Sequence, residues 1–205
     1  TTDSSGFFST QIPVDVSSAR GQHTIRVSYG GNEQFIGAAS NVTAYTWADV
    51  IIEIIDVSDN NIRSNSSHPI VITGRIIEIG GTGNAVINSD ISLIWAGAKE
   101  SGAVVTWDNA TGQFTVSLVG HSPMKGDLDF TLKMASDNIR FFNEAQKVGI
   151  DAFLMVPASF TADSVTIELN TREIVGTVSV YADDTGEALS NVSITALLLN
   201  QTSEL

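Results

Sequence analysis

The chain has 205 residues, of which 42% are hydrophobic and 16% are charged, and it contains no cysteine. Asp and Glu outnumber Lys and Arg by 23 to 10, which gives a formal net charge of −13 and argues strongly against nucleic acid as a partner. The lack of cysteine excludes disulfides and thiolate sites, and no apolar stretch reaches the roughly 18 residues of a membrane-spanning helix. The opening TTDSSGFF lacks the features of a secretion signal, which is typical of a mature product or a fragment.

Apolar residues alternate with period two along most of the chain, which predicts half-buried antiparallel strands. The first clear case is HTIRVSY at 23–29. Further strands are expected near 49–56, 69–79, 90–95, 103–107, 112–119, 127–135 and 145–156. A short helical period at 138–148 aligns with a segment that contains Gly37, so we expect a hairpin loop and a strand there.

Two internal matches recur after about one hundred residues, which indicates a tandem repeat. The segment 72–93 resembles 174–196, with Gly74 aligned to Gly176. The segment 6–45 resembles 112–151, and the aligned pairs include Gly6 with Gly112, Phe8 with Phe114, and Gly21 with Gly126.

The repeat predicts one complete domain between two half-domains. Seven short strands within about 105 residues are typical of an immunoglobulin-like (Ig-like) sandwich. We therefore expect tandem Ig-like antiparallel β-sandwiches, with the C-terminal half of one domain at 1–46, a complete domain at 47–156 and the N-terminal half of another at 157–205. An isolated half-sandwich exposes an apolar face and unpaired edges, so each half needs further strands from flanking sequence or from another chain.

The run GFFSTQIPVDVSSARGQHTIRVSYGGN resembles the end of bacterial and archaeal Ig-like repeats of large cell-surface proteins. The run GTVSVYADDTGEALSNVSITA resembles the start of carboxypeptidase-regulatory-like and related Ig-like modules. The resemblance implies a β-sandwich fold and an extracellular location at a cell surface. It implies little about function, because such modules serve as spacers, adhesins, wall proteins and enzyme appendages.

Five Asn-x-Ser/Thr sequences are candidate glycosylation sites. They are Asn41, Asn65, Asn109, Asn191 and Asn200. Asn109 and Asn65 lie in polar segments where exposure is expected. Ordinary turn asparagines are the alternative interpretation.

Two acidic clusters are candidate calcium ligands, because Ca²⁺ prefers several hard oxygen ligands and loops between Ig-like domains can supply them. They are Asp56, Asp59 and Asn60 in DVSDNN, and Asp183 and Asp184 in YADDTGE. Neither stretch has EF-hand spacing, so a solvated turn is the alternative. No other cofactor is expected.

No combination of residues indicates catalysis, and we expect no enzyme activity. His23, His68 and His121 lack the spacing of zinc ligands, and GGTG at 80–83 is followed by a strand rather than the helix of a phosphate-binding loop. Asp127 and Asp129 share one face of a strand, which we expect to be solvated. We expect Trp95 and Trp107 in the sandwich core, and Trp47 at the junction of the first two domains.

The expected function is that of a structural spacer in an extracellular tandem Ig-like protein, with neighbouring Ig-like domains or identical subunits as partners. Three alternatives stay open. The chain could form a filament or surface layer by strand exchange between copies, act as an adhesin that binds glycan or protein, or be an accessory domain of a secreted hydrolase.

Overall fold

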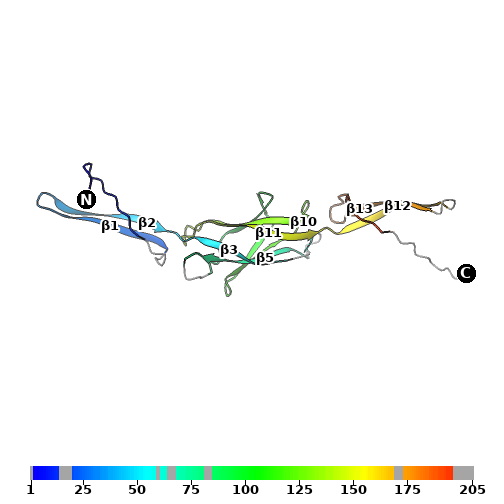
Figure 1. Ribbon diagram of the computed structural model, residues 1–205. Helices are drawn as coiled ribbons and strands as arrows, with labels where there is room; N and C mark the ends of the chain where they lie inside the picture. Colours follow the sequence, from blue (N-terminus) through cyan, green and yellow to red (C-terminus); the bar gives the residue numbers. More distant parts are fainter. Residues whose placement is uncertain are drawn as a thin grey trace. The chain divides into compact units, whose positions relative to one another are not determined.

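The computed structural model describes residues 2–13, 20–58, 61–63, 68–80, 85–168 and 173–195, with the backbone alone for 162–168 and 173–174. Every helix or strand assigned in these ranges is a β-strand, so the all-β fold class is confirmed (Figure 1). Across these ranges, no helix is long and apolar enough to cross a membrane.

The strands form two hairpins and two larger sheets. They are β1 (Gly21–Gly31), β2 (Ile36–Thr46), β3 (Val50–Val57), β4 (Asn61–Ile62), β5 (Ile70–Glu78), β6 (Ile91–Trp95), β7 (Ala98–Lys99), β8 (Val104–Asp108), β9 (Gln113–Leu118), β10 (Gly126–Met134), β11 (Ala145–Met155), β12 (Ala158–Glu168) and β13 (Glu173–Ala182). The expected strands between 49 and 156 are all present, and 138–148 is a turn followed by a strand, as predicted. The short strands β4 and β7 were not predicted, because two residues carry no periodicity.

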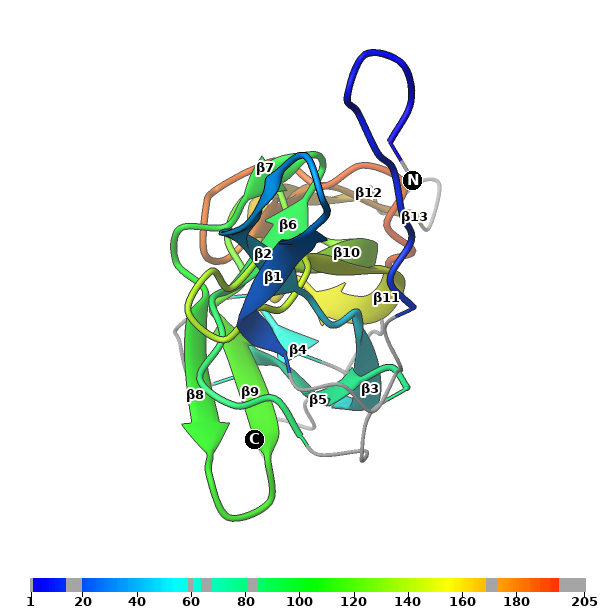
Figure 2. The ribbon, with the colours of Figure 1, turned by 90° about the vertical axis from the view of Figure 1, so that its left-hand side faces the viewer.

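The two larger sheets are the layers of a β-sandwich. One has the order β3-β5-β9-β8 and the other the order β4-β11-β10-β6-β7. Their main strands alternate buried and less buried residues, so each sheet has one apolar face that needs cover. Figure 2 shows the two sheets as separate layers. The fully buried side chains between them include Ile72, Ile76, Phe114, Val116, Phe130, Leu132 and Met134.

Gly74 in β5 shows how tightly this core is packed. A Cβ atom at this position would lie 2.6 Å from the carbonyl oxygen of Glu53 and 2.6 Å from Cζ of Phe114. Only glycine therefore lets the Phe114 ring lie against the β5 backbone.

The chain divides into two compact units. The first comprises Thr1–Ser58, Val71–Leu118 and Asp129–Ala152, and the second comprises Asp59–Ile70, Val119–Leu128 and Phe153–Leu205. Most of the sandwich and the β1–β2 hairpin belong to the first unit. The second contains β4 and the β12–β13 hairpin. The expected domain boundaries fall in the connectors between β2 and β3 and between β11 and β12, and the domain assignment stays a prediction.

The β12–β13 hairpin has the same irregularities as the β3–β5 pair. Both pairs are antiparallel, and each has one bulge, between Ile54 and Asp56 in β3 and between Ala162 and Ser164 in β12. The ends of the pairs are closed by the same kind of backbone hydrogen bond. The amide of Ile79 donates to Asp49 at 2.8 Å, and that of Asp183 donates to Pro157 at 2.9 Å.

A third shared feature follows the second strand of each pair, where Ile77 bridges to Ala85 and Tyr181 bridges to Ala188. When the bulges and bridges are matched, Gly74 corresponds to Val178 and Ile52 to Phe160. The sequence alignment of Gly74 with Gly176 is therefore wrong by two residues. The alternation of apolar residues is unchanged by such a shift, so the sequence pattern could not reveal it.

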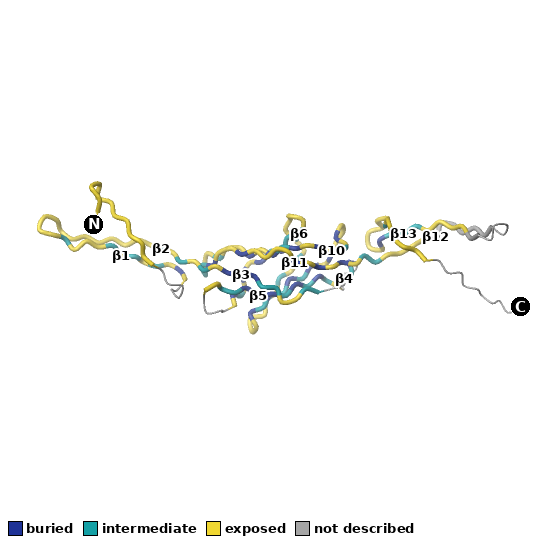
Figure 3. The backbone as a smooth tube through the Cα atoms, in the orientation of Figure 1, coloured by how far each residue is buried: buried dark blue, intermediate teal, exposed yellow. Residues whose placement is uncertain are grey.

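The β1–β2 hairpin has one apolar and one polar face. Its register pairs Ile25 with Val42 on one face, and Thr24 with Thr43 and Arg26 with Asn41 on the other. The described residues of both hairpins are mainly exposed, whereas many residues of the sandwich strands are buried (Figure 3).

The prediction that Trp95 and Trp107 are core residues is wrong, because both are half-buried. Trp107 lies on β8, the edge strand of its sheet, and its ring contacts that of Phe114 edge-on, with centroids 5.6 Å apart. Trp95 ends β6 directly before a tight turn in which Ala96 and Gly97 have positive φ. Edge and end positions leave one side of a large ring open to water.

Candidate functional site

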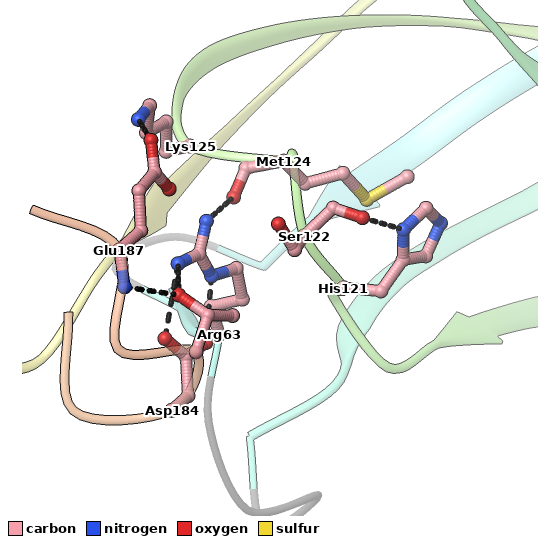
Figure 4. A network of polar contacts seen from close by, with 8 residues as sticks. Arg63, His121, Ser122, Met124, Lys125, Asp184 and Glu187 are labelled. Carbon is pink, nitrogen blue, oxygen red and sulfur yellow. Dashed lines mark hydrogen bonds and ion pairs between the residues drawn. The ribbon is translucent and has the colours of Figure 1, made fainter.

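Arg63 and Asp184 form the most buried ion pair among the described residues. The side chain of Arg63 is 0% exposed and that of Asp184 is 13% exposed. Nε of Arg63 donates to Oδ2 of Asp184 at 2.7 Å, and Nη2 donates to Oδ1 at 3.0 Å (Figure 4). Arginine therefore contacts both carboxylate oxygens in a two-point geometry that lysine cannot reproduce.

The position of Arg63 follows from the short strand before it. Asn61 and Ile62 pair in parallel with Leu154 and Met155 at the end of β11, and the amide of Arg63 donates to the carbonyl of Met155 at 2.9 Å. This pairing fixes the backbone and directs the guanidinium inward. Nη1 of Arg63 then donates to the carbonyl of Met124 at 3.1 Å.

Asp184 is held by the turn that follows β13. The amide of Gly186 donates to the carbonyl of Ala182 at 2.8 Å, and Gly186 has a φ of 69°, a conformation that glycine adopts without strain. The amide of Ala182 donates back to the carbonyl of Glu187 at 2.8 Å. The turn is therefore rigidly closed on both sides of Asp184.

The charges of the pair stabilise each other. Hydrogen bonding to Arg63 lowers the pKa of Asp184, although desolvation acts in the opposite direction. The same bonding raises the pKa of Arg63. Both groups are therefore ionised at neutral pH, and the buried guanidinium has its counter-charge in place.

A second ion pair lies in the same network. Nζ of Lys125 is 2.6 Å from Oε1 of Glu187, and both side chains are nearly half exposed. The hydrogen bond from Lys125 lowers the pKa of Glu187. Exposed pairs of this kind contribute at most about 1 kcal/mol, so Arg63 dominates the energetics of the network.

The β1–β2 hairpin contacts the sandwich through an aromatic cluster in the first unit. The ring of Phe141 stacks on Tyr45 at 5.7 Å and meets Trp47 edge-on at 5.4 Å, measured between centroids. The guanidinium of Arg20 lies 4.0 Å from the centroid of Phe142, and its Nε is 3.2 Å from Oε1 of Glu78. Trp47 thus lies in the connector between β2 and β3, and its place at a domain junction stays a prediction.

The turn that carries Phe141 is braced by Arg140 and Asp137. Nε of Arg140 lies 2.5 Å from Oδ2 of Asp137, Nη1 donates to the carbonyl of Ile87, and Nη2 donates to the hydroxyl of Ser89 at 3.0 Å. Desolvation opposes the charge of Asp137, but hydrogen bonds from Arg140 and Ile139 outweigh it and lower its pKa. The aromatic cluster therefore rests on a fixed loop.

The two clusters share a position of the sequence repeat. Arg20 precedes Gly21 and Lys125 precedes Gly126, and these aligned glycines begin β1 and β10. Each basic residue forms an ion pair with a glutamate, although Glu78 and Glu187 are not aligned with each other.

Three of the five candidate glycosylation sites are described, and all three are exposed. Asn41 lies on the polar face of β2, Asn109 lies in the turn between β8 and β9, and Asn191 has a φ of 59° in the segment after β13. Asn65 and Asn200 lie outside the described residues.

The calcium candidates are not gathered into one site in the described part of the chain. Asp56 is exposed on β3, Asp183 is exposed in the turn after β13, and Asp59 and Asn60 lie outside the described residues. Asp184 binds Arg63 rather than standing free. Within the described ranges, no group of three or more His, Asp or Glu side chains could hold a metal ion. Calcium binding at DVSDNN stays a prediction.

The three histidines have different surroundings. Nε2 of His23 is 2.7 Å from the hydroxyl of Thr46, Nδ1 of His121 is 2.9 Å from the carbonyl of Ser122, and His68 is exposed. Asp127 and Asp129 are both exposed, as predicted.

Sequence reasoning missed Arg63, because it lies in a segment so polar that we expected it to be exposed.

Comparison with protein-family models finds no match, and comparison with curated proteins finds none either.

Proposed function

We propose that the chain is a structural spacer of an extracellular cell-surface protein of the bacterial or archaeal Ig-like type. The observation that carries the proposal is the likeness of β12–β13 to β3–β5, which extends to the bulge, the closing hydrogen bond and the bridge. Matching irregularities are stronger support for a repeat than matching strands, because regular hairpins resemble one another in any fold.

A spacer needs resistance to bending where one module follows another. The contacts of Phe141 with Tyr45 and Trp47 support this role, as does the ion pair of Arg20 with Glu78. In the second unit, the buried Arg63–Asp184 pair ties the turn after β13 to residues that follow β4. Connectors of three residues after β2 and two after β11 leave little slack.

The surface chemistry supports an extracellular location. A net charge of −13 favours solubility and opposes side-by-side association of chains. The exposed glycosylation sequences at Asn41, Asn109 and Asn191 would permit glycans that shield strand edges.

Distances between two spin labels test the spacer role directly. The chain has no cysteine, so Thr24→Cys on the exposed polar face of β1 and Thr106→Cys on β8 can be labelled without background. We expect one narrow distance distribution between these labels. Phe141→Ala should broaden it, and Ile139→Ala, which alters an exposed residue of the same turn, should not. A broad distribution in the unmodified background would contradict a spacer.

A further inference from the structure

Residues 7–12, FFSTQI, have the composition of a strand but no strand partner among the described residues. They follow a turn in which Oδ1 of Asp3 accepts hydrogen bonds from the amides of Ser5 and Phe7, each at 2.9 Å. The amide of Gly6 donates to the carbonyl of Asp3 at 3.1 Å, and Gly6 has a φ of 81°.

A related turn, one residue longer, precedes β9 in the sandwich. Oδ1 of Asp108 accepts a hydrogen bond from the amide of Ala110 at 2.9 Å, and the amide of Gly112 donates to the carbonyl of Asp108 at 2.8 Å. Gly112 has a φ of 71°. Both segments thus follow an aspartate-capped turn that ends in a glycine of positive φ, and the sequence alignment makes residues 7–12 the counterpart of β9, with Phe8 in the place of Phe114.

Residues 7–12 and β9 differ sharply in how far they are buried. Phe114 is 0% exposed and Leu118 is 2% exposed, because β9 is hydrogen-bonded between β5 and β8 inside the sandwich. Their counterparts Phe8 and Ile12 are 50% and 55% exposed. Phe8 borders an open groove of about 980 Å³ that is also lined by Val27, Tyr29 and Phe35.

A position where such a strand could pair lies beside β13. In the sandwich, β5 has β3 on one side and β9 on the other. Its counterpart β13 has β12 on one side, and in the described ranges only the bridge to Ala188 lies along its other edge. The apolar face of this hairpin is uncovered, since Phe160 is 73% exposed and Val178 is 38% exposed.

We propose that residues 7–12 of one copy of the chain add as a strand to the edge of β13 that lies away from β12 in a second copy. Phe8 and Ile12 then join the face that carries Phe160 and Val178. Because Val178 stands where Gly74 admits the ring of Phe114, the ring of Phe8 must lie beside the Val178 side chain rather than directly over the β13 backbone. Backbone hydrogen bonds supply affinity and the alternating apolar side chains fix the register, as in other cases of strand addition.

The β1–β2 hairpin of the donor strengthens the contact. It carries an apolar face with Ile25 and Val42, which can cover β12–β13 as the β10–β11 pair covers β3–β5. Asn41 lies on the opposite, polar face, so a glycan there does not obstruct this contact. The contact is head to tail, and it propagates from copy to copy.

A second copy is the occupant because every copy carries both parts of the contact: residues 7–12, the counterpart of β9, and β13, the counterpart of the strand that pairs with β9. The proposal rests on the proposed repeat architecture and names the partner: another chain that carries the same strand.

The test uses the full chain with matched charge substitutions. Phe8→Glu disables the donor strand and Val178→Glu disables the acceptor face. Ser9→Glu and Thr177→Glu place the same charge at an exposed adjacent residue, on the opposite face of each strand. All four positions are outside the sandwich core, and thermal melting verifies that each variant stays folded.

Light scattering after size-exclusion chromatography gives the mass across a concentration series. We expect the unmodified chain and both control variants to form concentration-dependent oligomers, and Phe8→Glu and Val178→Glu each to be monomers. A mixture of the two monomeric variants should form a dimer that does not extend, because it contains one intact donor and one intact acceptor.

An unmodified chain that stays monomeric at every concentration overturns the proposal, and so does assembly that the two disabling variants retain. The spin-label measurement is independent of these results. A narrow distance distribution in a monomer retains the spacer function and rejects strand addition, whereas assembly with a broad distribution does the reverse.

Discussion

Arg63 donates two hydrogen bonds to the carboxylate of Asp184, and the two partners differ in their access to water. The guanidinium is 0% exposed, whereas the side chain of Asp184 retains 13% exposure. The cost of breaking the pair should therefore depend on which charge is left behind.

Asp184→Asn leaves a buried guanidinium without its counter-charge and should lower the free energy of unfolding by about 3 kcal/mol or more. Arg63→Met leaves a carboxylate that can reach water through the exposed turn, and should cost roughly 1–3 kcal/mol. Denaturation by urea, followed by circular dichroism, measures both.

Lys125→Gln is the matched control for these substitutions. It removes an ion pair of the same network whose partners are nearly half exposed, and it should cost less than about 1 kcal/mol. Equal losses from Asp184→Asn and Lys125→Gln would show that burial does not set the strength of the pair.

The stability of the second unit should fall on acidification. Hydrogen bonding to Arg63 lowers the pKa of Asp184 in the folded state, so the unfolded chain binds this proton more readily. The contribution of this ion pair to the free energy of unfolding is complete above a pH of about 4, the pKa of an aspartate in the unfolded chain. It is lost as the pH falls toward the pKa of Asp184 in the folded state. Melting temperatures between neutral and acidic pH should decline less steeply in Asp184→Asn than in the unmodified chain. Parallel curves for the two proteins would exclude this linkage.

The strands of the sandwich could be predicted from sequence because burial on one face imposes a period of two. The burial of Arg63 could not be predicted, because a buried arginine in a polar loop has the same local sequence pattern as an exposed one. Only its contact with the distant Asp184 distinguishes the two cases. The alignment of β13 with β5 could not be predicted correctly from the sequence either. The sequence alignment paired Gly74 with Gly176 because the residue types are identical, whereas the positions of the bulges pair Gly74 with Val178.

The glycosylation candidates predict that attached glycans increase the mass of the protein. Asn109 is exposed in the turn between β8 and β9, so an attached glycan would extend into solvent without displacing a core residue. Protein purified from its native source should exceed the polypeptide mass, and peptide mapping should locate glycan at Asn109 and at Asn65. Asn88 is followed by Ser89 and Asp90 and lacks the acceptor sequence, so it should be unmodified. Bare asparagine at both candidate sites would leave only the role of ordinary turn residues.

The final prediction contrasts Gly74 with its counterpart Val178. A methyl group at Gly74 would approach both the carbonyl oxygen of Glu53 and the Phe114 ring to 2.6 Å. Because Phe114 is fully buried and cannot retreat, Gly74→Ala should destabilise the sandwich by about 1–3 kcal/mol.

Val178 occupies the matching place in β13 but has no second sheet over it within the described residues, so Val178→Ala in a monomeric Phe8→Glu background should change stability by less than about 0.5 kcal/mol. Phe114→Leu combined with Gly74→Ala provides the check on mechanism, since a smaller side chain relieves the overlap and should recover part of the loss. A double substitution that is simply additive would mean that contact with the ring is not what requires glycine in β5.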